Sequence, residues 1–164
     1  RNKQRIEVCR VHRKVRNQRS DFLHKLSTEL VNDYGLIVFE DLHVRNMVRN
    51  HKLAKAISDC SWRKLIQLTQ NKAESAGSEV VLVDPKNTSQ ECSNCGKLVS
   101  KELSERVHQC PHCGLVMDRD DNASINILKK GLSKTTNRVG STRINSPGDR
   151  TSGLRKIFQV KFDL

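Results

Sequence analysis

Apolar residues recur at helical intervals through the first part of the chain, between Arg1 and Asn32. Spacings of three, four or seven residues place side chains on one face of a helix. Such residues are Val8, Val11, Val15, Phe22, Leu26 and Leu30. The pattern predicts a long amphipathic helix that buries this face, with Gly35 as its stop signal.

Two short apolar runs later in the chain are typical of buried strands. They are "LIVFED", Leu36 to Asp41, and "EVVLVD", Glu79 to Asp84. A helix is predicted between them, begun by Ser58 or Asp59 and ended by Gly77. Its inward face is Trp62, Leu65, Ile66, Thr69, Ala73 and Ala76. Strand, helix, strand is a βαβ unit, so we expect the two strands to be parallel.

The apolar pattern is interrupted over residues 86–117, which carry paired cysteines, and resumes as a predicted helix over residues 118–131. The inward residues of that helix are Ala123, Ile127 and Leu128. Residues 132–164 are rich in Ser, Thr, Gly and Arg without a period, so we expect a flexible basic tail. Its last apolar residues have no predicted partner; they are Ile157, Phe158, Val160 and Phe162.

The charge of the chain favours a polyanionic partner. Thirty Lys and Arg against 18 Asp and Glu give a net charge of +12 over 164 residues, which points to nucleic acid rather than a neutral substrate. No apolar run approaches the roughly 20 residues of a membrane span, and no signal peptide is visible, so an intracellular protein is expected. Basic side chains on the first helix fit a solvated face and nucleic-acid contact equally well. The candidate nucleic-acid-binding residues are Arg10, Arg13, Lys14, Arg16, Arg45, Arg49, Lys52 and Lys86.

Four cysteines have the spacing C-x2-C-x14-C-x2-C: Cys92, Cys95, Cys110 and Cys113. Each pair can form a tight turn, and the two turns together can surround a tetrahedral Zn²⁺. Two disulfides are the alternative, which a reducing cell interior disfavours. Four thiolates leave no open coordination position, so the expected role is structural. His108 and His112 are less favoured substitute ligands. Cys9 and Cys60 fall on predicted helices and are expected to be small buried residues rather than reactive thiols.

Carboxylates stand at the ends of two predicted elements: Glu40 ends the first strand, and Asp118, Asp120 and Asp121 begin the last helix. In a parallel α/β unit such positions gather at one edge of the sheet, where oxygen ligands can hold Mg²⁺. Capping of the helix explains the aspartates equally well. Neighbours on a helix point about 100° apart, so Asp120, in line with Ala123, should face the site and Asp121 should face away. Asp118 is expected to brace the turn.

Three segments carry a resemblance to a known family. "IVFEDL", "DPKNTSQECSNCG" and "HQCPHCGLVMDRDDNASINIL" resemble the C-terminal half of TnpB (OrfB) proteins, transposon-encoded RNA-guided nucleases related to type V CRISPR effectors. The resemblance covers about Asp21 to Lys130. It implies an α/β fold of RNase H-like (RuvC-like) type, truncated so that its first three strands are missing, with an inserted four-cysteine zinc ribbon. The expected segments are a RuvC-like part (1–85), the ribbon (86–117), the last helix (118–131) and the tail (132–164).

The resemblance also implies site residues. Glu40 matches the second catalytic carboxylate of the family, and Asp120 matches the third, in a D-x-N-A pattern with Asn122 and Ala123. Ser124 departs from the Ala that is common there. The family's first catalytic Asp has no match before Glu40, so the chain is expected to lack it and to begin within the helix after the missing strands. The strand ending at Glu40 would then expose an edge that should be covered.

The function implied is that of a transposon-associated, RNA-guided, divalent-metal-dependent DNA endonuclease, of which this chain is the C-terminal part and is inactive alone. The implied partners are DNA, a guide RNA and the missing N-terminal portion, without a membrane, in the prokaryotic cytoplasm at the nucleoid. One structural Zn²⁺ is expected per chain, and catalytic Mg²⁺ only in the complete protein. The alternative is a non-catalytic zinc-ribbon nucleic-acid-binding remnant of a transposon protein.

Overall fold

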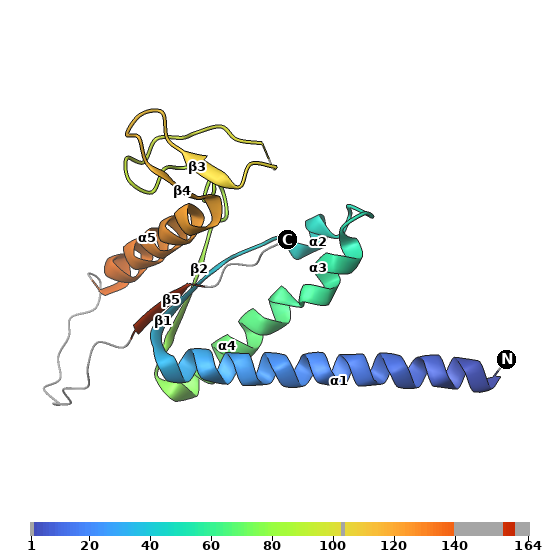
Figure 1. Cartoon of the computed structure of the whole chain (residues 1–164). Coiled ribbons are helices and arrows are strands. Elements are labelled where there is room, and N and C mark those ends of the chain that lie inside the picture. The colour runs from blue at the N-terminus through green and yellow to red at the C-terminus, as the bar shows by residue number, and fades with distance from the viewer. Residues whose placement is uncertain (1, 103, 140–155, 160–164) are drawn as a thin grey trace, which may run out of the picture.

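The computed structural model describes residues 2–102, 104–139 and 156–159 (Figure 1). The elements in chain order are α1 (Asn2–Asp33), β1 (Tyr34–Glu40), α2 (Val44–Met47), α3 (Ala54–Cys60), α4 (Trp62–Ala76), β2 (Glu79–Val83), β3 (Val107–Gln109), β4 (Val116–Asp118), α5 (Arg119–Val139) and β5 (Lys156–Gln159). None of the helices in these ranges is long and apolar enough to cross a membrane.

The main sheet has the order β2-β1-β5, with both neighbours parallel to β1. Leu36 lies opposite Glu79 and Glu40 opposite Val83, so β1 and β2 end at the same edge. The pairing continues one residue further, because the N–H of Asp41 donates to the Val83 carbonyl at 2.8 Å. The predicted parallel βαβ unit is confirmed.

Helices cover both faces of the sheet (Figure 1). Successive side chains of a strand point to opposite faces, and all three central residues of β1 are fully buried. Ile37 and Phe39 pack with α1 and α4, whereas Val38 packs with β2 and with Ile127 of α5. This pattern explains why "LIVFED" is continuously apolar rather than alternating.

The prediction that α1 buries its apolar face is wrong for the first two-thirds of the helix. Four of its members are between 45% and 62% exposed: Val8, Val11, Val15 and Phe22. The residues that α1 buries are Leu23, Ser27, Leu30 and Val31. The first turns of α1 extend past the other elements (Figure 1), so no described element packs against them.

Two predicted helix boundaries also differ from the structure. Ser58 and Asp59 lie inside α3, and α4 begins after Ser61, which has a left-handed backbone with φ 54°. Gly35 does not stop the first helix, because α1 ends at Asp33 and Gly35 lies in β1. Gly77, at φ 68°, ends α4 as expected, since glycine adopts the left-handed conformation without strain.

The C-terminal region differs most from expectation. Helix α5 continues through Gly131 to Val139, where the tail was expected to start. Residues 156–159 form β5, in which Ile157 and Phe158 lie opposite Leu36 and Ile37 of β1. The edge of β1 is therefore covered by a strand from the predicted tail. Val160 and Phe162 fall outside the described residues.

Candidate functional site

The four cysteines of the predicted metal site lie on two turns of the same form. In the first turn the Cys92 carbonyl accepts from Gly96 N–H at 2.9 Å, and Cys92 N–H donates to the Lys97 carbonyl at 2.9 Å. In the second turn the Cys110 carbonyl accepts from Gly114 N–H at 3.0 Å, and Cys110 N–H donates to the Leu115 carbonyl at 2.8 Å. The two glycines have φ of 72° and 73°, a conformation that a side chain disfavours.

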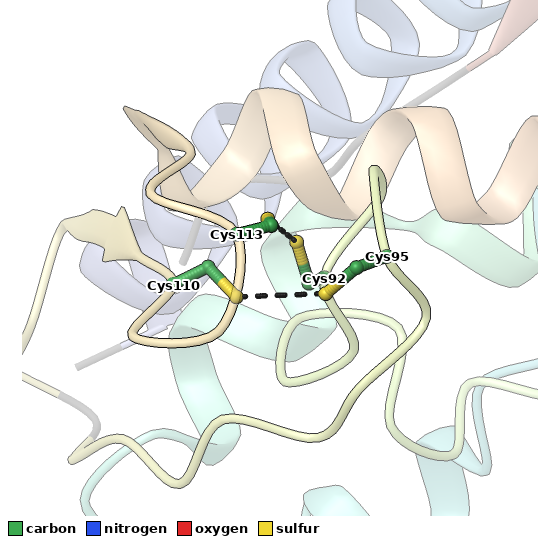
Figure 2. A group of neighbouring side chains, drawn as sticks. All are labelled: Cys92, Cys95, Cys110 and Cys113. Atoms are coloured by element: carbon green, nitrogen blue, oxygen red, sulfur yellow. Dashed lines mark hydrogen bonds between the residues drawn. The ribbon is translucent and has the colours of Figure 1, made fainter.

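The four sulfur atoms converge on one point (Figure 2). They all lie within 4.8 Å of one another, and the Cys92–Cys113 and Cys95–Cys110 Sγ distances are both 3.6 Å. A tetrahedron of thiolates about 2.3 Å from a zinc ion has sulfurs about 3.8 Å apart. A disulfide requires about 2.05 Å, and all six cysteines of the chain are free. The cluster can therefore hold a metal ion.

The thiols of the cluster differ in acidity. The backbone N–H of Leu115 lowers the pKa of Cys113 to about 6. The backbone N–H of Lys97 lowers the pKa of Cys95, but burial and hydrogen bonds with the other three thiols together outweigh it and raise the pKa to about 11. Since a metal ion binds thiolates rather than thiols, loading the cluster must release protons.

The two histidines beside the cysteines do not join the cluster. His112 is exposed. His108 is fully buried on β3, where burial and the nearby ammonium of Lys101 lower its pKa. Its Nδ1 contacts the Lys101 Nζ, and its Nε2 has no hydrogen-bond partner in the described part of the chain. Burial and the nearby ammonium thus favour neutral imidazole.

Two buried asparagines of α5 join the cysteine segment to the helix. Asn122 accepts from Ser93 N–H at 2.8 Å through Oδ1 and donates to the Glu91 carbonyl at 2.7 Å. Asn126 donates to the Glu91 carbonyl at 2.7 Å and to the Thr88 carbonyl at 3.0 Å. These contacts flank Cys92 in sequence. The sequence analysis did not predict these contacts. The signal that could have indicated them is the four-residue spacing of Asn122 and Asn126, which places both amides on one helix face.

Glu40 stands at the end of β1, where Thr88 donates a hydrogen bond to its Oε1 at 2.7 Å. Thr88 precedes the first cysteine turn and is 4% exposed. Its backbone carbonyl is the acceptor of Asn126. A chain of hydrogen bonds therefore runs from the predicted catalytic carboxylate to α5, the helix whose first turn contains Asp120.

The three aspartates around the start of α5 have distinct surroundings. Asp118 accepts from the Asp120 N–H at 2.7 Å, so it caps the helix. The Asp120 side chain is 22% exposed and lies 3.4 Å from the Nε of Arg119 and 4.0 Å from Arg106. Asp121 is exposed. This order of exposure agrees with the helix geometry that favours Asp120 over Asp121.

Within residues 2–102, 104–139 and 156–159, no three carboxylates lie close enough to share an ion. Among the described residues, the only group of three or more His, Cys, Asp or Glu side chains close enough to share an ion is the cysteine cluster. Carboxylate oxygens such as those of Glu40 and Asp120 are of the type that suits Mg²⁺, but the described residues do not form a complete carboxylate site.

The candidate nucleic-acid-binding residues lie on three segments of the chain. Arg10, Arg13, Lys14 and Arg16 are exposed on α1, and Arg10 forms an ion pair with Glu7 at 3.0 Å. Arg49 and Lys52 follow α2, and Lys86 follows β2; all three are exposed. Arg45, on α2, lines a cavity of about 530 Å³ just beyond the end of β1. Arg63, which sequence reasoning did not single out, lines the same cavity and pairs with Asp41 at 3.5 Å.

Comparison with known proteins places the chain among transposon proteins. A family model described as "Cas12f1-like, TNB domain" matches residues 62–127, and one described as "Probable transposase" (OrfB_IS605) matches residues 1–51. A Streptomyces pristinaespiralis protein named "Putative RNA-guided DNA endonuclease" is 45% identical over 96% of this chain and 42% of its own length. The mimivirus "TnpB-like protein L79" is 37% identical over 74% of this chain and 24% of its own. The chain belongs to the TnpB (OrfB) family.

The resemblance inferred from the motifs is thus confirmed, and the TnpB-family chain spans less than half the length of these relatives. Its fold is similar to a chain in a solved structure titled "Cryo-EM structure of the Cas12f1-sgRNA-target DNA complex". The TM-score is 0.57 and the identity 22%, over 76% of this chain and 38% of the other. At this identity the likeness concerns the fold alone.

Proposed function

We propose that the chain is the C-terminal part of an RNA-guided, divalent-metal-dependent DNA endonuclease with a RuvC-like fold of RNase H type. The 45% identity to the Streptomyces relative supports the activity. One observation supports placing part of the catalytic site in this chain. Hydrogen bonds connect Glu40 to α5 through Thr88 and Asn126. Two acidic positions on separate elements are thereby tied into one framework at the end of a parallel pair of strands.

The ion of the cysteine cluster is Zn²⁺ in this proposal. The support is chemical: four soft thiolates at near-tetrahedral spacing suit zinc and exclude magnesium. With four protein ligands the ion has no position for water or substrate. Its role is to hold residues 86–117 as a ribbon inserted between the RuvC-like segment 1–85 and the last helix.

Glu40 and Asp120 are the proposed Mg²⁺ ligands of this chain, and a third carboxylate comes from elsewhere in a protein of the relatives' length. When bound, Mg²⁺ activates water and neutralises charge that develops on the scissile phosphate. Asp120 sits in the first turn of α5, where the helix dipole attracts negative charge. The basic residues of α1, α2 and the β2 end would bind phosphates without reading sequence, which pairing with a guide RNA would supply.

One observation favours a second candidate, a non-catalytic nucleic-acid-binding remnant. The described residues contain no group of three carboxylates close enough to share an ion, so they do not form a complete Mg²⁺ site. The two candidates predict different effects of adding the upstream sequence to the chain. Either protein would act in the prokaryotic cytoplasm at the nucleoid.

A cleavage assay separates the two candidates. The chain alone, and the chain extended by the sequence encoded upstream of Arg1, are each loaded with zinc and mixed with labelled DNA, RNA from the same locus and Mg²⁺. We expect both proteins to bind DNA and only the extended one to cut it. Cleavage by the chain alone would contradict the incomplete site, and an inert extended protein would favour the remnant.

A further inference from the structure

The loop between β2 and the first cysteine turn contains a hydroxyl aimed at Glu40. Thr88 is 4% exposed, and its Oγ1 lies 2.7 Å from Glu40 Oε1 and 3.0 Å from the Pro85 carbonyl. A hydroxyl has one proton, so it donates to one of these acceptors at a time. The carboxylate is both nearer and charged, and a charged acceptor makes the stronger bond. The proton therefore belongs mainly to the bond with Glu40.

Thr88 is itself held from the opposite side. Its carbonyl accepts from Asn126, and the same amide group donates to the Glu91 carbonyl, one residue before Cys92. The Asn126 side chain is 5% exposed, so water competes little for these bonds. The Thr88 backbone is thus fixed between helix α5 and the cysteine turn, and its hydroxyl has little freedom to follow a Glu40 side chain that moves.

We propose that Thr88 is a positioning residue: it fixes the Glu40 carboxylate for a divalent ion and makes that geometry depend on the folded cysteine ribbon. The inference rests on the proposed role of Glu40 as a metal ligand. A glutamate has several rotatable bonds, and a hydrogen bond to Oε1 restricts them while leaving Oε2 for the ion. Partners of metal ligands contribute in this way to metal affinity, and losing one typically costs roughly tenfold or more.

The alternative is that Thr88 only stabilises its loop. Substitution by Val keeps the branched shape and removes the hydroxyl, whereas Ser keeps the hydroxyl and removes the methyl group. A positioning role predicts that metal affinity follows the hydroxyl. A role confined to loop stability predicts that metal affinity is the same in both variants once each is folded.

The experiment uses the 164-residue chain loaded with zinc, and Mn²⁺ as the probe, because Mn²⁺ binds too weakly to displace zinc from thiolates. Paramagnetic broadening of backbone amide signals near Glu40 gives the apparent Mn²⁺ affinity. Wild type is compared with Thr88→Val, Thr88→Ser and Glu40→Gln. Zinc content and the fluorescence of Trp62 confirm that each variant is folded, and Thr88→Ala replaces Thr88→Val if the latter loses zinc.

We expect Thr88→Val to weaken Mn²⁺ binding by roughly tenfold and Thr88→Ser to stay near wild type. Glu40→Gln should abolish the local broadening. If Thr88→Val and Thr88→Ala bind like wild type while Glu40→Gln does not, the positioning role is wrong and the role of Glu40 stands. If Glu40→Gln also binds like wild type, the proposed metal site fails and the role of Thr88 fails with it.

A second readout applies to the extended protein. Thr88→Val should raise the Mg²⁺ concentration for half-maximal cleavage by a similar factor, and saturating Mg²⁺ should restore the rate. A damaged loop would instead lower the rate at every Mg²⁺ concentration.

Discussion

The cysteine cluster and the carboxylates lie in adjoining parts of the molecule, but they are built in opposite ways. All four sulfur ligands come from two turns of the same form between Cys92 and Cys113. Glu40 and Asp120 belong to different elements, β1 and α5, which are connected by packing and by the bonds of Thr88 and Asn126. A site made from local turns is complete in a short segment, whereas a site made from distant elements depends on the whole fold.

The largest effect is expected where the site is local. Cys92→Ser should reduce zinc from one ion per chain to none and unfold the ribbon, because structural zinc contributes about 10 kcal/mol or more to such folds. Elemental analysis of protein purified under reducing conditions measures the zinc. Cys60→Ser is the matched control. Cys9 and Cys60 were expected to be buried, but both are exposed, and Cys60 lies outside the cluster. Zinc retained by Cys92→Ser would show that three sulfurs suffice.

The next largest effect concerns the carboxylates in the extended protein. Asp120→Ala and Glu40→Ala should each abolish cleavage and leave DNA binding intact, since only the metal ligand is removed. Asp121→Ala is the control and should keep most activity, because that side chain is exposed on the helix. Cleavage that survives Asp120→Ala but is lost with Asp121→Ala would reverse the assignment.

The packing that joins the two regions can be tested at Gly131. A Cβ added there would lie 2.5 Å and 2.8 Å from the two methyl groups of the fully buried Val38. Gly131→Ala should therefore lower the free energy of unfolding by about 1–3 kcal/mol, despite the better helix propensity of Ala. Denaturant unfolding measures it, with the exposed Ser133→Ala on the same helix as control. A stabilised Gly131→Ala would mean that α5 can move away from β1.

The smallest effect is expected for single basic residues. Arg13→Ala should weaken DNA binding equally for all sequences and reduce the dependence of log K on log salt by about one unit. Gln18→Ala, also exposed on α1, is the uncharged control. If Arg13→Ala and wild type show the same salt dependence of DNA binding, Arg13 does not contact DNA phosphates. The basic surface of α1 would then be an ordinary solvated face.

The features that could be predicted from the sequence are those signalled by residues close together in the chain. The cysteine cluster and the β1–β2 pair were predicted because spacing and apolar runs are local signals. The buried face of α1 was not, because a helical period identifies a face but does not say whether another element covers it. Val8 and Leu30 fit the same period, yet one is 55% exposed and the other 3%. Thr88 and Asn126 were missed because a buried polar residue is recognised by its partners, which are distant in sequence.

The strand β5 has a consequence for how the chain folds. Lys156 pairs with Tyr34 across 122 residues, whereas Leu36 pairs with Glu79 across 43. Closing the longer loop costs more entropy, so β5 should join the sheet last. In the described part of the chain β1 can pair with β2 before β5, and until β5 joins, one side of β1 presents free N–H and C=O groups. An edge of this kind can pair with a strand of a second copy, so any delay in the docking of β5 would favour aggregation.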